Sequence, residues 1–385
     1  MKKIKIARVV TVPIVYTHIL DLLRAISSDP RFELHIICSE GQFLKELKLL
    51  LPNAIFHCLE IPREINIKKD LKALWLLVLL YWRERFDIVH SLTPKAGFTN
   101  ALAGFIARVP VRIHTYTGQV WVTLRGSKRD LLIWLDRVIA ILNTQNYTDS
   151  LGQKKFLLES KIGNDKSLSV LHKGSLGGIN TERFDYVKLE SEIKKLKKEL
   201  FPNFTGKILI FLGRMNHEKG LYELVEAFDE LKKKFAVKLL LVGPMESEGN
   251  PLFSNLINKL QADSDVVLIN FTATPEYYLG VGDIFCFPSY REGFGTVALE
   301  ASAMKKPIVA SNIYGLADAV ADNTSGLLFE ARNAKDLTSK IERLLLDEPL
   351  AAKLGEQGRE RVINDFSDKI MTKKMIDEYL ALVKR

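Results

Sequence analysis

The chain has 385 residues, of which 47% are hydrophobic and 26% are charged. This length and composition predict a folded protein of two or three domains and exclude disorder, collagen-like repeats and a coiled coil. No apolar stretch reaches the ~18 residues of a membrane-spanning helix, and residues 73–82, the longest such stretch, predict a buried helix. The three cysteines, Cys38, Cys58 and Cys286, lie far apart in apolar segments, which predicts reduced core side chains rather than disulfides.

The net charge of +9 is unevenly distributed along the chain. Residues 1–180 hold 26 lysine and arginine against 15 aspartate and glutamate residues, a balance of +11, whereas residues 181–385 hold 29 against 31, a balance of −2. We therefore expect the first half to face an anionic membrane surface, a phosphorylated substrate or a nucleic acid.

Apolar strands alternate with helices twice along the chain. Strands are expected at residues 3–12, 32–40, 87–92, 111–118 and 145–150, and again at 207–213, 237–243, 266–272, 284–289 and 307–311. Helices are expected at 69–85, 99–108, 128–142, 222–235, 250–262 and 296–304, with an all-helical end over 335–384. Continuous apolar strands separated by helices predict parallel, doubly wound sheets.

The charged helical stretch 191–206 separates the two sets of elements. The expected domains are residues 1–185, residues 186–365, and a C-terminal helix over 366–385 that packs back on the first domain. Two Rossmann-like domains of this kind would face a cleft, where ligands bind outside the carboxyl ends of the strands.

Residues 288–311 form the segment richest in chemical signals. An expected strand ends at Pro288, a loop containing Gly293 and Gly295 follows, and a helix begins near Thr296. Glycines permit a close backbone approach to a ligand, and the helix start offers N–H groups to an anion or a sugar. Within that loop and helix, Glu292 and Glu300 can accept hydrogen bonds from hydroxyl groups; alone, they could equally be ordinary surface glutamates.

Residues 207–228 repeat this strand, loop and helix pattern. The strand ends at Gly213, and Arg214 and Lys219 flank the loop that precedes the next helix. Two cations and a helix start at a strand end suit a diphosphate.

Together these segments resemble the family-4 retaining glycosyltransferases of the GT-B fold. The spaced glutamates match Glu292 and Glu300, and the Gly-Arg…Glu-Lys-Gly loop matches Gly213, Arg214 and residues 218–220. Residues 170–184 and 312–337 also resemble family segments, and the likeness to bacterial surface-polysaccharide members covers nearly the whole chain. The resemblance implies an α/β fold of two doubly wound domains, and a hexosyl- or N-acetylhexosaminyltransferase that moves a sugar from a nucleotide-sugar donor with retained anomeric configuration.

The same resemblance implies a role for individual residues. Arg214, Lys219 and Glu292 would be the catalytic residues, the first two holding the donor diphosphate. Glu300 would bind the ribose. The donor sugar would lie against Glu292 and the backbone of Gly293, Phe294 and Gly295, and the remaining donor-binding residues would be Gly213 and, at the base, Thr272 and Ala273.

The acceptor side departs from the family pattern. The first loop, residues 11–20, lacks the usual glycines, and Thr117 stands where a histidine often precedes a glycine, with His114 three residues earlier. The acceptor-side candidates are His90, Lys95, His114 and Thr117, although each histidine could equally be a structural core residue.

No metal or resident cofactor is expected. The only Asp-x-Asp, residues 263–265, predicts a solvated turn, and Arg214 and Lys219 supply positive charge; the donor is expected to be UDP-linked. Two alternatives remain open. One is a nucleotide-sugar epimerase of the same fold. The other is a basic nucleic-acid-binding protein, although this sequence contains no nucleic-acid recognition motif.

Residues 121–137 combine Trp121, Leu124 and Trp134 with basic side chains. This segment either packs on the first sheet or reaches anionic lipid headgroups. With the basic first domain, it leads us to expect a cytoplasmic enzyme that is peripheral at the inner face of the membrane, extends a lipid-linked glycan and does not bind nucleic acid.

Overall fold

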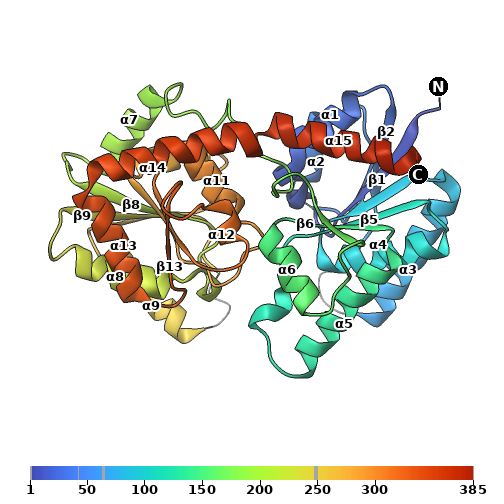
Figure 1. The fold of residues 1–385 in the computed structure, drawn as a ribbon, viewed down its shortest axis with the longest axis horizontal. Coiled ribbons are helices and arrows are strands. Elements are labelled where there is room, and N and C mark those ends of the chain that lie inside the picture. The colour runs from blue at the N-terminus through green and yellow to red at the C-terminus, as the bar shows by residue number, and fades with distance from the viewer. Residues whose placement is uncertain (1, 42, 63–65, 247–249, 385) are drawn as a thin grey trace. The chain divides into compact units, whose positions relative to one another are not determined.

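The computed structural model describes residues 2–41, 43–62, 66–246 and 250–384, and this part of the chain forms two compact units (Figure 1). Unit 1 comprises Met1–Gly178 and Asp368–Arg385, and unit 2 comprises Ile179–Ser367. The boundaries expected from the sequence, at 185/186 and 365/366, are displaced from these divisions. The first boundary comes earlier because the Ile179 N–H donates to the Phe366 carbonyl at 2.8 Å and Phe184 lies in the core of unit 2.

Unit 1 is built on a seven-stranded parallel sheet with the order β3-β2-β1-β4-β5-β6-β7. Its strands are β1 (Ile4–Val9), β2 (Phe32–Cys38), β3 (Ile55–Cys58), β4 (Ile88–Ser91), β5 (Val111–Tyr116), β6 (Gln145–Thr148) and β7 (Leu168–Val170). Its helices are η1 (Pro13–Ile19), α1 (Leu20–Ser28), α2 (Leu44–Leu50), α3 (Ile67–Glu84), α4 (Pro94–Ile106), η2 (Val120–Thr123), α5 (Ser127–Leu142), α6 (Leu151–Glu159) and α15 (Asp368–Lys384).

Successive side chains of β1 point to opposite faces of this sheet and define two apolar layers. Ile6 and Val10, the residue just after the strand, pack with residues of α1, α2 and α15, whereas Ala7 and Val9 pack with residues of α3 and α4. The cysteine expectation is wrong in one case, because Cys58 on the edge strand β3 is exposed. None of the helices in the described residues is long and apolar enough to cross a membrane.

Unit 2 is built on a six-stranded parallel sheet with the order β10-β9-β8-β11-β12-β13. Its strands are β8 (Lys207–Leu212), β9 (Val237–Val242), β10 (Val266–Ile269), β11 (Ile284–Phe287), β12 (Ile308–Ser311) and β13 (Leu327–Phe329). Its helices are α7 (Glu190–Leu200), η3 (His217–Lys219), α8 (Leu221–Leu231), α9 (Pro251–Ala262), α10 (Pro275–Val281), α11 (Thr296–Ala303), α12 (Leu316–Ala319), α13 (Ala334–Leu346), α14 (Glu348–Arg361) and η4 (Val362–Phe366). The two doubly wound parallel sheets confirm the fold class expected from the sequence.

The C-terminal helix α15 packs against α1 and closes a buried polar network in unit 1. Arg8 of β1 is fully buried, and its guanidinium donates to His90 Nδ1 at 2.6 Å and to the Tyr379 hydroxyl of α15. His90 Nε2 lies 2.8 Å from the Thr115 hydroxyl. Burial, reinforced by Arg8, lowers the pKa of His90 well below its ordinary value, so this imidazole is neutral and can accept from Arg8.

This network makes the Tyr379 hydroxyl important for the stability of unit 1. Tyr379→Phe removes an acceptor from a buried guanidinium, so we expect a loss of about 1–3 kcal/mol in the free energy of unfolding. Urea unfolding followed by circular dichroism measures it, with Tyr186→Phe in unit 2 as the control. A Tyr379→Phe variant as stable as the control would show that the hydroxyl contributes nothing.

Candidate donor site

The candidate site lies at the topological switch point of the unit 2 sheet. β8 pairs with β9, the next strand of the chain, on one side and with β11 on the other. The loops that follow β8 and β11 therefore begin at neighbouring carboxyl ends of the sheet, which is where open α/β sheets bind ligands. The two chemically rich segments of the sequence supply these two loops, residues 213–220 and 288–295.

Glycines allow the two loops to touch. Gly220 has a φ of 66°, and a Cβ at this position would lie 2.0 Å from the Pro288 carbonyl oxygen of the other loop. Gly295 has a φ of 84°, and its Cβ would lie 2.4 Å from the Leu316 side chain. A side chain at Gly220 would push the two loops apart, and one at Gly295 would collide with Leu316 of α12 and strain the backbone.

Two ion pairs join the loops, because an acidic residue followed by a basic one in the first loop meets a basic residue followed by an acidic one in the second. Glu218 pairs with Arg291 at 2.6 Å, and the next residue, Lys219, pairs with Glu292. The Tyr290 N–H also donates to the Glu218 carbonyl at 2.9 Å. The four paired side chains are only 15–18% exposed, so their charges are screened less than those of surface pairs.

Arg214 occupies the outer side of the first loop. Its guanidinium donates to Glu246 at 3.0 Å, and the same carboxylate accepts from the Asn216 amide at 3.2 Å. Asn216 in turn caps η3 by accepting from the Glu218 N–H. The Arg214 side chain is 56% exposed, so it remains open to a ligand from solvent.

Glu300 lies one turn into α11 and is half-buried. Burial raises the pKa of its carboxyl to about 7, with Arg183 opposing the rise and Glu276 adding to it. Arg183 is held by Glu276 at 2.8 Å and by the Ala273 carbonyl at 2.7 Å. One guanidinium therefore connects the loop after β10 to the surroundings of Glu300.

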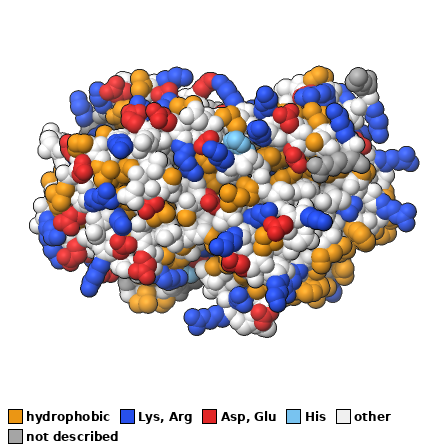
Figure 2. Space-filling model, viewed as in Figure 1, with side chains coloured by type: hydrophobic (Ala, Val, Ile, Leu, Met, Phe, Trp, Pro, Cys, Tyr) orange, Lys and Arg blue, Asp and Glu red, His pale blue; other side chains and the backbone are white. Residues whose placement is uncertain are grey.

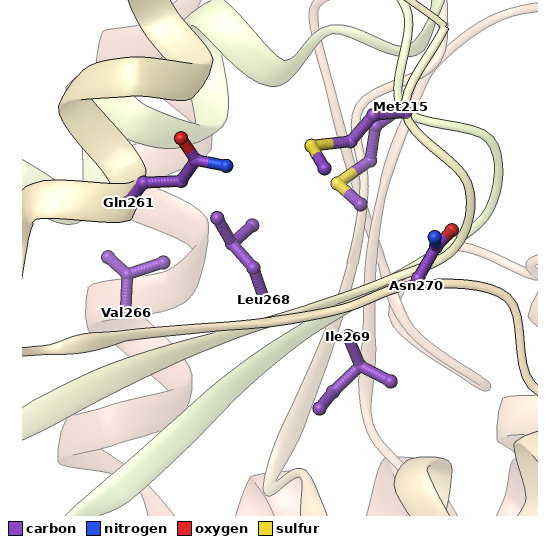
Figure 3. A pocket seen from close by; sticks show the side chains of 7 residues that line it. Met215, Gln261, Val266, Leu268, Ile269 and Asn270 are labelled. Carbon is purple, nitrogen blue, oxygen red and sulfur yellow. The ribbon is translucent and has the colours of Figure 1, made fainter.

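The loop after β10 contains the other predicted donor-binding residues, Thr272 and Ala273. Thr274 N–H donates to the Thr272 hydroxyl at 3.1 Å, which fixes the turn. A pocket of about 340 Å³ adjoins this loop, with two methionine side chains on one wall (Figure 3). Its lining residues are Met215, Met245, Gln261, Val266, Leu268, Ile269 and Asn270.

The acceptor-side candidates fall into two groups. His90 and His114 are at most 1% exposed, and both are hydrogen-bonded. His114 Nδ1 lies 3.0 Å from the Ser91 hydroxyl. Burial also lowers the pKa of His114 to about 3. This burial favours the structural interpretation for both histidines, because neither has surface to offer an acceptor. Lys95 pairs with Asp70 at 2.8 Å, and Thr117 is exposed; for these two residues an acceptor role stays a prediction.

The Asp-x-Asp sequence forms a hydrogen-bonded turn. The Asp265 N–H donates to the Asp263 carboxylate at 2.9 Å, and Lys232 donates to the same carboxylate at 2.6 Å. Within the residues that the structure describes, no cluster of three or more His, Cys, Asp or Glu side chains could hold a metal ion.

Sequence reasoning missed Arg291 and Arg183. The only sequence signal for Arg291 is the order of charges, because Glu218-Lys219 and Arg291-Glu292 are complementary dipeptides. Arg183 lies in the segment 170–184 that resembles the family, but it comes 90 residues before its partner Ala273, so the resemblance alone did not assign it to the site.

Two doubly wound units, one with paired charges at its switch point, are the architecture of GT-B glycosyltransferases. Residues 192–361 match the family model described as glycosyl transferases group 1. The capsular polysaccharide biosynthesis glycosyltransferase CapM of Staphylococcus aureus is 33% identical over 91% of this chain and 90% of its own length. The chain therefore belongs to the group 1 glycosyltransferase family. This membership confirms the enzyme class expected from the sequence and gives no support to the epimerase alternative.

Two further similarities extend over nearly the whole chain. The N,N'-diacetylbacillosaminyl-diphospho-undecaprenol alpha-1,3-N-acetylgalactosaminyltransferase of Campylobacter jejuni is 28% identical over 96% of both chains. The crystal structure of Anabaena Alr3699/HepE in complex with UDP and glucose aligns with a TM-score of 0.82 over 98% of this chain and all of that one, at 17% identity. At this identity the structural likeness concerns the fold.

The raised pKa of Glu300 gives a stability prediction with a defined sign. A carboxyl whose pKa is about 7 when folded, against an ordinary 4.5, contributes stability below pH 4.5 that is lost as the pH rises through 7. Glu300→Gln has no such proton to lose. We therefore expect the Tm of this variant to exceed that of the wild type by a few degrees at pH 8 and to match it at pH 5.

Thermal unfolding at the two pH values measures this difference, with Glu226→Gln, at an exposed position of α8, as the control. An equal Tm shift at both pH values would contradict the buried, raised-pKa carboxyl.

Proposed function

We propose that this enzyme transfers a hexosyl or N-acetylhexosaminyl unit from a nucleoside diphosphate sugar to a lipid-linked glycan, with retention of anomeric configuration, in the synthesis of a surface polysaccharide. The observation that supports it most is the Lys219–Glu292 pair, which joins a cation suited to a diphosphate and a carboxylate suited to sugar hydroxyls at one switch point. A retaining reaction also follows the family resemblance of both loops.

In the proposed reaction the bond between the anomeric carbon and the diphosphate breaks, and the acceptor oxygen forms a bond to the same face of that carbon. The acceptor proton passes to an oxygen of the departing diphosphate, so no protein base is required. Lys219 and Arg214 stabilise the negative charge that develops on the leaving group. Glu292 orients Lys219 and accepts from hydroxyl groups of the donor sugar, which also lies against the backbone of residues 293–295.

Glu300 binds the ribose in this proposal, and the pocket beside the loop after β10 receives the base. Its volume and mixed lining of methionine, aliphatic and amide groups suit a flat heterocycle with polar edges. We propose a UDP-linked donor because HepE, of the same fold, was crystallised with UDP and glucose.

The acceptor assignment rests on relatives and on charge. The Campylobacter jejuni relative is named for a diphospho-undecaprenol acceptor, and CapM for capsular polysaccharide synthesis. The balance of +11 over residues 1–180 suits both a diphosphate-linked lipid and an anionic bilayer. We therefore propose that the enzyme is peripheral at the inner face of the cell membrane.

The first test concerns the two cations. Arg214→Ala or Lys219→Ala should each lower kcat by ~10²–10³-fold, because a charge that stabilises the departing diphosphate is lost. The measurement is nucleoside diphosphate release from a panel of nucleotide sugars, with membrane extract as acceptor. Lys233→Ala, at an exposed position of unit 2 remote from the loops, is the control. Wild-type turnover in the folded double variant would remove both residues from the mechanism.

A second test concerns metal ions. Because Arg214 and Lys219 provide positive charge at the diphosphate, we expect sugar transfer to continue at a similar rate in EDTA. The same release assay, run with EDTA and then with added Mg²⁺ or Mn²⁺, measures this. A strict requirement for either ion in the chemical step would contradict the assigned role of the two cations.

A further inference from the structure

The helix layer formed by α3, α4 and α5 exposes an unusual number of large apolar side chains. On α3, which the sequence predicted to be a buried helix, Trp75 is 56% exposed and Trp82 is 48% exposed. Adjacent helices of the layer continue the apolar surface, and orange side chains gather over this part of unit 1 in Figure 2. The exposed apolar residues of the three helices are Ile67, Leu71, Trp75, Leu76, Leu79, Trp82, Phe105, Ile106, Leu131, Trp134 and Ile141.

These side chains form stripes rather than isolated exceptions. Leu71, Trp75, Leu79 and Trp82 follow the helical spacing i, i+4, i+8, i+11, so they lie along one side of α3. The opposite side of α3 buries its own set, including Leu77 and Tyr81, against the sheet. The fold therefore buries one apolar side of α3 and leaves the other exposed, where it can contact a second apolar surface.

Cations are in excess in the part of the chain that carries this apolar surface. Residues 66–142 hold twelve lysine and arginine residues against five aspartate and glutamate residues, a balance of +7. Exposed cations of the region are Lys68, Lys69, Lys72, Arg83, Arg85, Arg108, Arg125, Lys128, Arg129 and Arg137. A second copy of this chain would bring the same excess of positive charge against itself, which disfavours self-association through this face.

The two tryptophans of residues 121–137 differ in their exposure. Trp121 is 2% exposed, its indole N–H donates to Asp136 at 2.7 Å, and its ring stacks on Phe156, so it belongs to the core. Trp134 and Leu131 on α5 remain exposed. Exposed tryptophans together with many exposed lysine and arginine side chains are the composition of a surface that enters the headgroup region of an anionic bilayer.

We propose that the exposed face of α3, α4 and α5 is a membrane-docking surface that inserts Trp75, Trp82 and their apolar neighbours into an anionic bilayer. This inference rests on the proposed function, which requires a lipid-linked acceptor. Because apolar insertion adds to the attraction of the cations, binding should weaken with salt but persist in part at high ionic strength.

Sedimentation of the full-length enzyme with vesicles tests the proposal. We expect binding to phosphatidylglycerol-containing vesicles and weak binding to phosphatidylcholine vesicles. Trp75→Ser with Trp82→Ser should weaken binding to anionic vesicles by about 100-fold, since each half-exposed ring contributes roughly tenfold on burial. A triple variant with Arg125→Glu, Lys128→Glu and Arg129→Glu should bind anionic vesicles more weakly than the wild type at low salt. Leu346→Ser, at a 70% exposed position of unit 2, is the matched apolar control.

Activity measured in parallel separates this inference from the proposed function. The tryptophan double variant should lose activity on a lipid-linked acceptor in vesicles and keep wild-type activity on a water-soluble acceptor analogue. If the double variant binds vesicles as the wild type does, or if the wild type binds neither kind of vesicle and instead associates with itself or with a soluble protein through this face, the docking surface is wrong. If the wild type transfers no sugar to either acceptor, the proposed function fails, whatever the vesicles show.

Discussion

The candidate site depends on the contact between two loops that follow neighbouring strands and whose paired side chains lie 73 residues apart in the chain. Glu218–Arg291 and Lys219–Glu292 lock these loops in register, and Gly220 permits the approach because no Cβ stands between it and Pro288. Each pair satisfies charges that would be costly to leave alone at this depth. The order of the charges also matters, since a slip of one residue would place Lys219 beside Arg291. The protein itself therefore fixes the two loops relative to each other, which is the preorganisation that the proposed stabilisation of a leaving group requires.

The same site contains a carboxyl group, that of Glu300, whose negative charge is destabilised by burial. Glu300 is buried enough for its pKa to rise to about 7, and Glu276 nearby adds to the cost of its charge. A glutamine would serve the fold as well or better at neutral pH. In the proposed function a carboxylate is preferred there because it can accept hydrogen bonds from two hydroxyl groups of a ribose. The neighbouring Arg183 moderates this cost and links Glu300 to the loop after β10.

Sequence reasoning predicted the elements whose burial is complete. β8, β9 and β11 are largely apolar because both faces of their sheet are covered, and the loops after β8 and β11 could be found by their glycines. β1, in contrast, carries the buried Arg8 and is followed by a loop without glycine. Sequence reasoning did not predict β7, which has three residues and a serine at its centre, because so short a strand is defined by pairing with β6. Nor could it distinguish a neutral, buried His90 from a surface base, since both read as a histidine at a strand end. Residues such as Arg291 and Arg183 acquire their roles only when distant segments meet.

Unit 1 departs from the usual distribution of side chains in two opposite ways. Inside, Arg8, His90 and His114 occupy fully buried positions, and their hydrogen bonds repay part of the desolvation and tie α15 to the sheet. Outside, Trp75 and Trp82 meet edge to face with ring centres 6.3 Å apart, a contact too small to cover either ring. Nothing within the described part of unit 1 compensates for this exposed surface as hydrogen bonds compensate for the buried polar groups. The proposed membrane docking accounts for this exposed apolar face, because its tryptophans would enter the headgroup region while the cations in the same part of the chain attract anionic lipid.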